Sequence, residues 1–359
     1  MLEITDEVYI QQIPLKLTLA FDQVTSEADP PSIYVMASRH TYLPCIASQE
    51  LGHFQHVLQP NANTLAAWFD FEGAPLKWQF PVGVLYDLCH PGHRNLPWHL
   101  TVNPLQSPPY LPWHLTIHYG DFPSQVLLRC DTETAVRSRF TNSLKEAAFV
   151  LTGSATSVMQ MTRPQQEALW SAVAAGRVKD FWQSAGALNL SPSLRGARSS
   201  RIPVCVLVTD IPPDGRWSWE FAAATTLPVE AVSASGHETT LSEVLERCLP
   251  DKCLTAAAEQ AVEPGSPPSG DGDRDALDAS SSPQSSLGGP PATVLGGRAE
   301  EHPAPGRTSA RVLVAGVELP LSASLLWCHE LLKHPDHFLY VVVHTGRKDE
   351  GMHAGPTSS

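Results

Sequence analysis

The chain has 359 residues, of which 42% are hydrophobic, and it carries a formal net charge of −13. This length exceeds one ordinary core and suits two or three small domains, and the hydrophobic fraction is that of a globular protein. The acidic balance argues against a nucleic-acid-binding protein, which needs clustered positive charge, and against strong electrostatic docking on anionic lipid.

Cysteine usage and the N-terminus bear on the compartment. The seven cysteines are scattered and odd in number, which is not the pattern of a disulfide framework and favours thiols in a reducing compartment. The sequence has no apolar run of the ~20 residues that cross a bilayer. Residues 1–7 are acidic and lack the basic start and apolar stretch of a signal peptide. The sequence therefore predicts a cytoplasmic protein.

The first predicted domain, residues 1–128, alternates strands with short helices. Leucines at every second position predict its first strand, and an apolar pair on each side of a Glu72-Gly73 turn predicts a hairpin. The expected strands are 15–19, 33–36, 68–71, 76–80 and 115–119, and the expected helices begin near Ser48 and Val84. This order of elements indicates a small α+β roll of the ubiquitin type.

The second predicted domain, residues 129–195, is helical. Its first helix shows apolar residues at three- and four-residue steps. These are Val136, Phe140, Leu144, Ala147 and Leu151. A capping box from Thr162 to Gln165, with Pro164 in the first turn, opens the next helix.

The third predicted domain, residues 196–345, repeats the first pattern. A strand at 202–208 precedes a helix opened by the capping box Thr240–Glu243, and further strands are expected at 312–314 and 338–343. Residues 251–310 interrupt it with eight Pro, eight Gly and eight Ser and no aromatic residue. Such a segment cannot bury enough apolar surface to offset its ordering entropy, so we expect a disordered insertion there and a disordered tail at 346–359.

Four stretches of the chain resemble the autophagy protein 5 family. They are residues 68–88, 111–118, 140–149 and 334–339. The stretch 140–149 is especially similar to plant-type members, and the resemblance covers nearly all of the chain outside the insertion, in the right order. It implies an α+β fold in which two ubiquitin-like (β-grasp) domains flank a helix-rich domain.

The resemblance also implies a function without catalysis or cofactor. Family members are linked through a lysine to the ubiquitin-like autophagy protein 12, and the conjugate binds autophagy protein 16. Together they promote transfer of autophagy protein 8 to phosphatidylethanolamine at the preautophagosomal membrane. The family lysine corresponds to Lys145, and Arg39 and Tyr42 lie where the family has a groove for a partner helix.

The residues around Lys145 are compatible with an acceptor role. Its helical neighbours one turn away are Thr141, Asn142, Ala148 and Phe149. None of them is acidic, so no intrahelical ion pair is expected to hold the ammonium. A free lysine has a pKa near ~10.4, so the neutral attacking amine has to be produced by desolvation or by a base on the conjugating enzyme.

The chain departs from the family pattern at a doubled motif. The run Leu-Pro-Trp-His-Leu-Thr occurs at 96–101 and again at 111–116. One strand position in a small sheet accepts only one copy. We predict that the copy at 111–116 forms the core strand, because the residues that follow it match the family.

The sequence leaves two other function classes to compare with a conjugated scaffold. An unconjugated adaptor that uses its ubiquitin-like domains only for binding is the main alternative. A hydrolase or metalloenzyme lacks a motif, since neither Cys89-His90 with His93 nor Cys328-His329 with His334 and His337 has the paired spacing of a zinc site. The Leu-Gly-Gly runs at 287–289 and 295–297 lie inside the insertion, where a flexible linker is the simpler interpretation.

Overall fold

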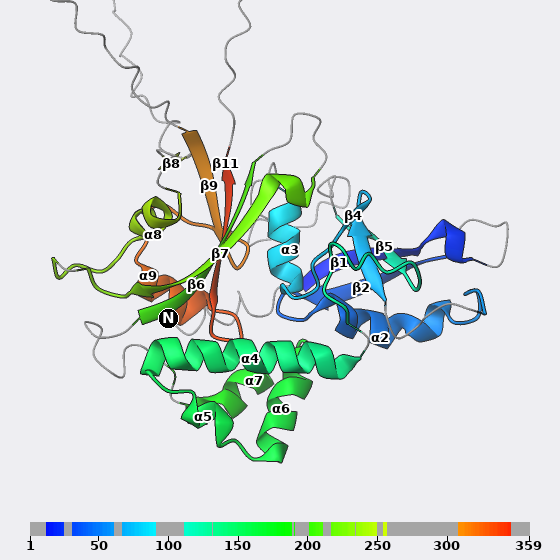
Figure 1. Ribbon diagram of the computed structural model, residues 1–359, viewed down its shortest axis with the longest axis horizontal. Helices are drawn as coiled ribbons and strands as arrows, with labels where there is room; N and C mark the ends of the chain where they lie inside the picture. The colour runs from blue at the N-terminus through cyan, green and yellow to red at the C-terminus, as the bar shows by residue number, and fades with distance from the viewer. Residues whose placement is uncertain are drawn as a thin grey trace, which may run out of the picture.

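The computed structural model describes residues 12–24, 31–60, 67–90, 111–130, 132–188, 190, 201–210, 217–233, 235–249, 254–256 and 308–345. They form two mixed sheets side by side, with helix α3 between the sheets and a group of helices along one end of both (Figure 1). The predicted α+β class is confirmed.

The first sheet has the strand order β2-β1-β5-β3-β4. Its strands are β1 (Gln12–Leu19), β2 (Ser32–Ser38), β3 (Trp68–Phe71), β4 (Ala74–Pro75) and β5 (Trp113–His118), and its helices are α2 (Leu43–Phe54) and α3 (Val82–Cys89), with a short turn η1 (Phe21–Gln23). β1 and β5 run parallel at the centre, which is the β-grasp arrangement. The leucines of β1 are buried as the alternation predicts.

The copy of the repeat that fills the sheet is the one at 111–116. Trp113, Leu115 and Ile117 of β5 are 1%, 2% and 0% exposed. The prediction for this copy is confirmed, and the copy at 96–101 lies outside the described residues.

Two predicted elements of this domain are wrong in their bounds. Helix α2 begins at Leu43, with Tyr42 as N-cap and Pro44 in the first turn, so Ser48 lies inside it. The second strand of the hairpin is the two-residue β4 and not 76–80. After Leu76 donates its N–H to Phe69 O the chain leaves the sheet, because Trp78 turns away to donate to Leu128 O at 2.6 Å.

The helical region consists of α4 (Glu133–Thr152), α5 (Thr156–Met159), α6 (Arg163–Ala174), α7 (Val178–Ala185) and the short turn η2 (Gly186–Leu188). The predicted capping box at Thr162–Gln165 is present. No helix in the described part of the chain is long and apolar enough to cross a membrane.

The second sheet has the order β10-β9-β11-β6-β7, with β8 paired to β9. Its elements are β6 (Arg201–Asp210), η5 (Trp219–Phe221), β7 (Ala222–Glu230), α8 (Leu241–Cys248), β8 (Leu254–Ala256), β9 (Thr308–Val314), β10 (Val317–Glu318), α9 (Leu325–Leu332) and β11 (Leu339–Thr345). β6 and β11 are parallel at the centre, so this sheet repeats the topology of the first.

The predicted insertion at 251–310 contains strand residues near both of its ends. Residues 254–256 form β8, and residues 308–310 belong to β9, its parallel partner. The expected disorder of 251–310 is therefore corrected at these ends, where strand pairing supplies hydrogen bonds that composition alone does not reveal. Residues 257–307 and 346–359 lie outside the described residues.

The two sheets share one hydrophobic core across α3. Val84 and Leu85 of α3 belong to the same buried cluster as Leu207, Tyr340 and Val342 of the second sheet. A separate core lies under α8 and α9, and a third holds the helical region together. The shared core fixes the two rolls to each other.

Candidate functional site

Helix α4 carries the candidate acceptor and is held on both sides. Phe140, Leu144 and Ala148 pack into the helical core, and Ala147 joins the core shared by the two sheets. The helix ends at Gly153, whose φ of 76° lets its N–H donate to Phe149 O at 2.8 Å. α4 is therefore a fixed support for the side chains on its outer face.

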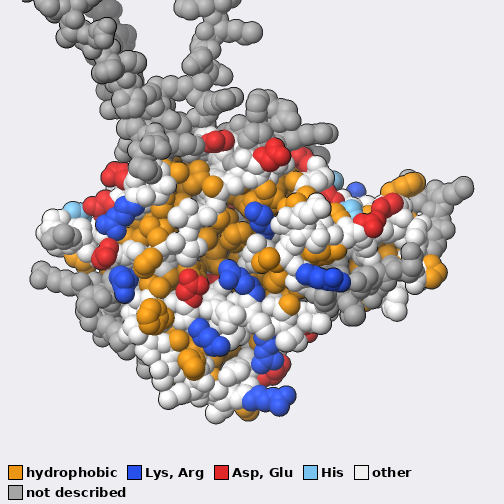
Figure 2. Space-filling view, viewed as in Figure 1, with side chains coloured by type: hydrophobic (Ala, Val, Ile, Leu, Met, Phe, Trp, Pro, Cys, Tyr) orange, Lys and Arg blue, Asp and Glu red, His pale blue; other side chains and the backbone are white. Residues whose placement is uncertain are grey.

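Lys145 is half-buried, at the border between the packed and the outer face of α4. Asn142 and Glu146 beside it are exposed, and Phe149, one turn further on, has an exposed fraction of 58%. No described carboxylate lies within 4.0 Å of its amine. Figure 2 shows Lys and Arg side chains scattered among hydrophobic ones over the visible face of the helical region. Among the described residues the amine thus has no fixed counter-ion, and an apolar side chain lies one turn away.

The other lysines lie in different surroundings. Lys16 is in β1, Lys179 is exposed in α7, and Lys252 and Lys348 lie outside the described residues. Lys77 lies after β4 and is not in a strand, so that prediction is wrong. Its amine lies 4.0 Å from the ring centre of Trp219, and burial lowers its pKa.

Lys333 shows a feature that the sequence did not reveal. Its Nζ donates to Glu330 O at 3.1 Å and lies 5.1 Å from the ring centre of Trp182. Burial lowers its pKa to about 8. Deprotonation of this amine is easier than that of an ordinary lysine, but its contacts with α7 and α9 hold it within the fold.

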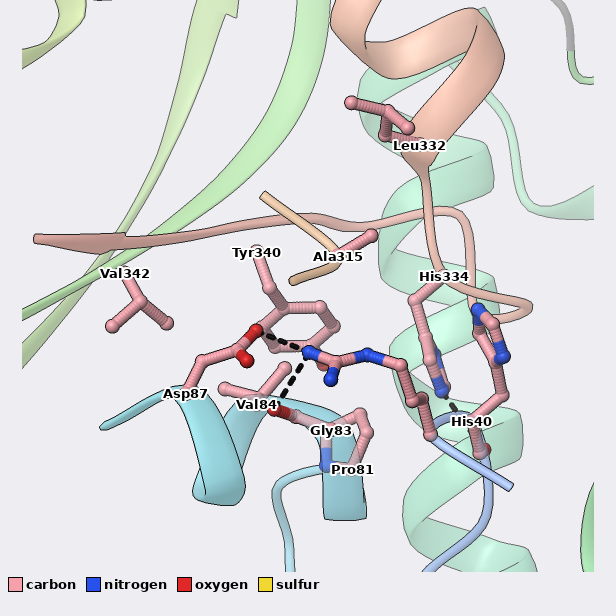
Figure 3. Close-up of a pocket in the computed structure, with 11 residues that line it drawn as sticks. His40, Pro81, Gly83, Val84, Asp87, Ala315, Leu332, His334, Tyr340 and Val342 are labelled. Atoms are coloured by element: carbon pink, nitrogen blue, oxygen red, sulfur yellow. Dashed lines mark hydrogen bonds and ion pairs between the residues drawn. The ribbon is translucent and has the colours of Figure 1, made fainter. Parts of the chain in front are cut away.

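Arg39 forms a buried ion pair where the two rolls meet. It follows β2 and has an exposed fraction of 5%, and its Nη2 donates to the carboxylate of Asp87 and to Gly83 O (Figure 3). Burial raises the pKa of Asp87, and Arg39 together with the backbone N–H of Gly316 opposes that shift. Gly316 belongs to the turn between β9 and β10, so the pair joins the first roll to the second.

The packing around Arg39 requires glycine at two positions. A Cβ on Gly83 would lie 2.7 Å from Arg39 Cβ, and one on Gly316 would lie 2.7 Å from Arg39 Cζ. The small cavity beside the pair, of about 30 Å³, is also lined by His40, His334 and Tyr340. Figure 3 shows these side chains around the ion pair.

Tyr42 lies in the same junction and is 1% exposed. Its ring meets that of His334 edge-on at 5.9 Å, and His334 Nε2 contacts His40 O at 3.0 Å. The expectation that Arg39 and Tyr42 line a groove for a partner helix is therefore corrected. Both side chains are buried by contacts within the chain. Arg39 contacts Asp87, 48 positions away, and Tyr42 contacts His334, near the other end of the chain, so no local sequence pattern could show their burial.

The remaining described His, Cys, Asp and Glu side chains form no metal site, and the buried thiols are unreactive. In the described ranges no three His, Cys, Asp or Glu side chains are placed to hold a metal ion. Burial raises the pKa of Cys45 to about 12 and of Cys205 to about 11, so these thiols are poor nucleophiles. Burial also lowers the pKa of His329 to about 3 and of His344 to about 4.

Three family models match consecutive parts of the chain. They are described as "Autophagy protein ATG5, UblA domain" at residues 8–119, "alpha-helical bundle region" at 133–189 and "UblB domain" at 201–343. Each of the three architectural units described above thus has its own match, in the same order.

Similar proteins include plant members. The chain is 29% identical to "Autophagy protein 5" of Oryza sativa subsp. indica, covering 94% of this chain and 92% of that protein. It is 28% identical to "Autophagy protein 5" of Arabidopsis thaliana, covering 70% and 80%. The crystal structure of Kluyveromyces marxianus Atg5 superposes with a TM-score of 0.58 at 17% identity, over 95% of this chain and 99% of that one, which shows the fold.

Proposed function

The chain belongs to the autophagy protein 5 family and has a role in autophagy; from this premise we propose that it is a non-catalytic acceptor, linked through Lys145 to the ubiquitin-like autophagy protein 12. The observation that carries the proposal is the setting of Lys145. It lies on a helix fixed by two cores, without a described carboxylate partner, beside an exposed phenylalanine.

The reaction is aminolysis of a thioester. The neutral Nζ of Lys145 attacks the terminal carbonyl of the modifier, which the conjugating enzyme carries on a cysteine. The new C–N bond replaces the C–S bond, the cysteine leaves as thiolate, and a base takes the proton of the amine. This chain supplies the nucleophile and a rigid surface, and the enzyme supplies the base and the desolvation that favour the neutral amine.

The conjugate acts together with autophagy protein 16 to promote lipidation of autophagy protein 8 at the preautophagosomal membrane, with the chain itself cytoplasmic and peripheral. Support comes from the rigid union of two ubiquitin-like rolls with the helical region, which presents several surfaces at fixed angles. Because Arg39 and Tyr42 are buried, we place the binding of autophagy protein 16 on exposed surface elsewhere.

The test is conjugation in a reconstituted mixture of activating enzyme, conjugating enzyme and modifier. Lys145→Arg keeps the positive charge but removes the usable nucleophile, so the covalent product should disappear while binding of autophagy protein 16 is retained. Lys179→Arg, an exposed lysine on α7, and Lys333→Arg are matched controls that should conjugate normally. Full conjugation of Lys145→Arg would contradict the assignment, and absence of any covalent product in the native chain would favour an unconjugated adaptor.

A further inference from the structure

Strand β2 is an edge of the first sheet without the usual protection. It contains no charged residue and no proline, and its outer side chains Tyr34 and Met36 are 69% and 58% exposed. The other long edge strand, β7, carries Pro228, which has no N–H, and Glu230. The remaining described edge strands are short: β4 and β10 have two residues each and β8 has three. Natural sheets blunt long edges with charge, proline or shortness, and β2 has none of these.

The backbone of β2 points unpaired groups outward at known positions. Leu19 donates its N–H to Pro31 O, which makes Leu19–Pro31 a hydrogen-bonded pair of the β1–β2 ladder. Such pairs alternate, so Ile33 and Val35 also face β1. Ser32, Tyr34 and Met36 therefore direct their N–H and C=O away from the sheet, and no described residue pairs with them there.

The accessible length of the edge sets the register of any added strand. Residues 32–36 are exposed or half-buried, whereas Ala37 and Ser38 are buried. Ser38 lies against the helical region, where a Cβ on Gly176 would stand only 2.5 Å from Ser38 Cβ. An added strand can thus extend from Ser32 to Met36 and no further.

We propose that β2 is a self-association surface, on which a second copy of this chain adds its own β2 antiparallel about a two-fold axis at Tyr34. In that register Tyr34 faces Tyr34 of the second copy, Ile33 faces Val35, and Ser32 faces Met36. Every outward backbone group then finds a partner, with about six hydrogen bonds across the axis. The tyrosine rings add an aromatic cross-strand pair on the outer face.

The charges near the edge permit this pairing. Lys16 of β1 lies opposite Tyr34 of β2. In the dimer the strand order would be β1, β2, β2 of the second copy and its β1, so the two Lys16 residues are separated by three strand spacings, roughly 14 Å. This exceeds the Debye length of about 8 Å at physiological salt, so their repulsion is screened. Each chain carries a net charge of −13, so added salt should strengthen the association by screening the repulsion between whole molecules.

The size of the surface makes the association weak. Stable dimers bury about 1,200–2,000 Å², and a five-residue strand pair supplies less. We expect a dissociation constant of roughly 0.1–1 mM. A second copy is favoured over an unrelated extended peptide because the exposed strand complements itself in this register. Tyr34 faces Tyr34, Ile33 faces Val35, and no charged residue of the strand requires an opposite charge.

Site-directed cross-linking of the full chain tests both the surface and the register. Tyr34→Cys places two thiols across a hydrogen-bonded pair, where Cα atoms are ~5.5 Å apart, a distance that suits a disulfide. Met36→Cys is the control, because its two copies would be about 13 Å apart. After mild oxidation Tyr34→Cys should give roughly tenfold more linked dimer than Met36→Cys or the unmodified chain.

Sedimentation velocity gives an independent measurement. The unmodified chain should show a dimer that increases with concentration and with salt. Tyr34→Lys should abolish it, and Met159→Lys, which alters an equally exposed apolar residue on α5, should not. Equal cross-linking of the two cysteine variants, or a monomer at all concentrations up to ~1 mM, would overturn the proposal.

Discussion

Removal of the Arg39 guanidinium tests how much its buried ion pair, at the junction of the two rolls, contributes to stability. In Arg39→Met the carboxylate of Asp87, 7% exposed, keeps the N–H of Gly316 but loses its counter-ion. Leaving one charge of a buried pair uncompensated costs about 3–5 kcal/mol. We expect urea unfolding at pH 7 to show a loss of stability of that size. The double variant Arg39→Met/Asp87→Leu should recover most of it, because it buries no charge.

The pH dependence of Arg39→Met gives a second measurement of the same pair. Burial already raises the pKa of Asp87, and loss of Arg39 raises it further. A carboxyl whose folded pKa is raised binds a proton more readily in the folded state, so the stability deficit of the variant should shrink as pH falls through that pKa. A cost below ~1 kcal/mol, or single-variant costs that simply add in the double variant, would refute the coupling.

Three further predictions concern the core, the buried histidines and the insertion. Trp113→Ala should destabilise the chain by about 3–5 kcal/mol in urea unfolding, whereas Trp98→Ala in the other copy of the repeat should change stability little; equal effects would show that both copies fill the core. Below pH 6.5 the stability should fall, because the unfolded state protonates His329 and His344 while the folded state, with pKa values of about 3 and 4, does not. Each histidine contributes a loss of about 2 kcal/mol at pH 5. In urea unfolding at several pH values, His344→Gln should show a smaller dependence of the unfolding free energy on pH. Replacing residues 258–306 by a Gly/Ser linker of about twelve residues, the length that a connection between parallel strands such as β8 and β9 needs, should leave the melting temperature nearly unchanged. A large decrease would show that the segment contributes to the core.

The sequence predicts those elements whose burial follows a regular period. The leucines of β1 and the apolar positions of α4 are buried as their spacing indicates. Capping boxes at Thr162 and Thr240 also lie where expected, because they depend on residues only three positions apart.

Elements whose structure depends on distant contacts were missed or misplaced. β7 was not predicted, since Ala222–Thr226 has no apolar alternation, and its strand conformation follows from pairing with β6. Trp78 and Lys77 appeared to continue a strand, but partners at Leu128 and Trp219 draw them out of the sheet. Their positions are set by tertiary contacts, which override local propensity.

The candidate site also has one part that the local sequence predicts and another that depends on distant contacts. Lys145 could be placed on the outer side of a helix from periodicity alone, while its acceptor role came from the family resemblance. The burial of Arg39 could not be foreseen, because its partner Asp87 and the turn at Gly316 lie far along the chain. A short polar segment after a strand gives no local sign of whether it will be buried.

The assignment of Lys145 as the acceptor is tested most directly by mass spectrometry of the chain isolated from its native cells. After proteolysis, a branched peptide should carry the C-terminal residues of the modifier on Nζ of Lys145. Its absence in a sample that contains the higher-mass conjugate, with the branch found on another of the seven lysines instead, would contradict the assignment.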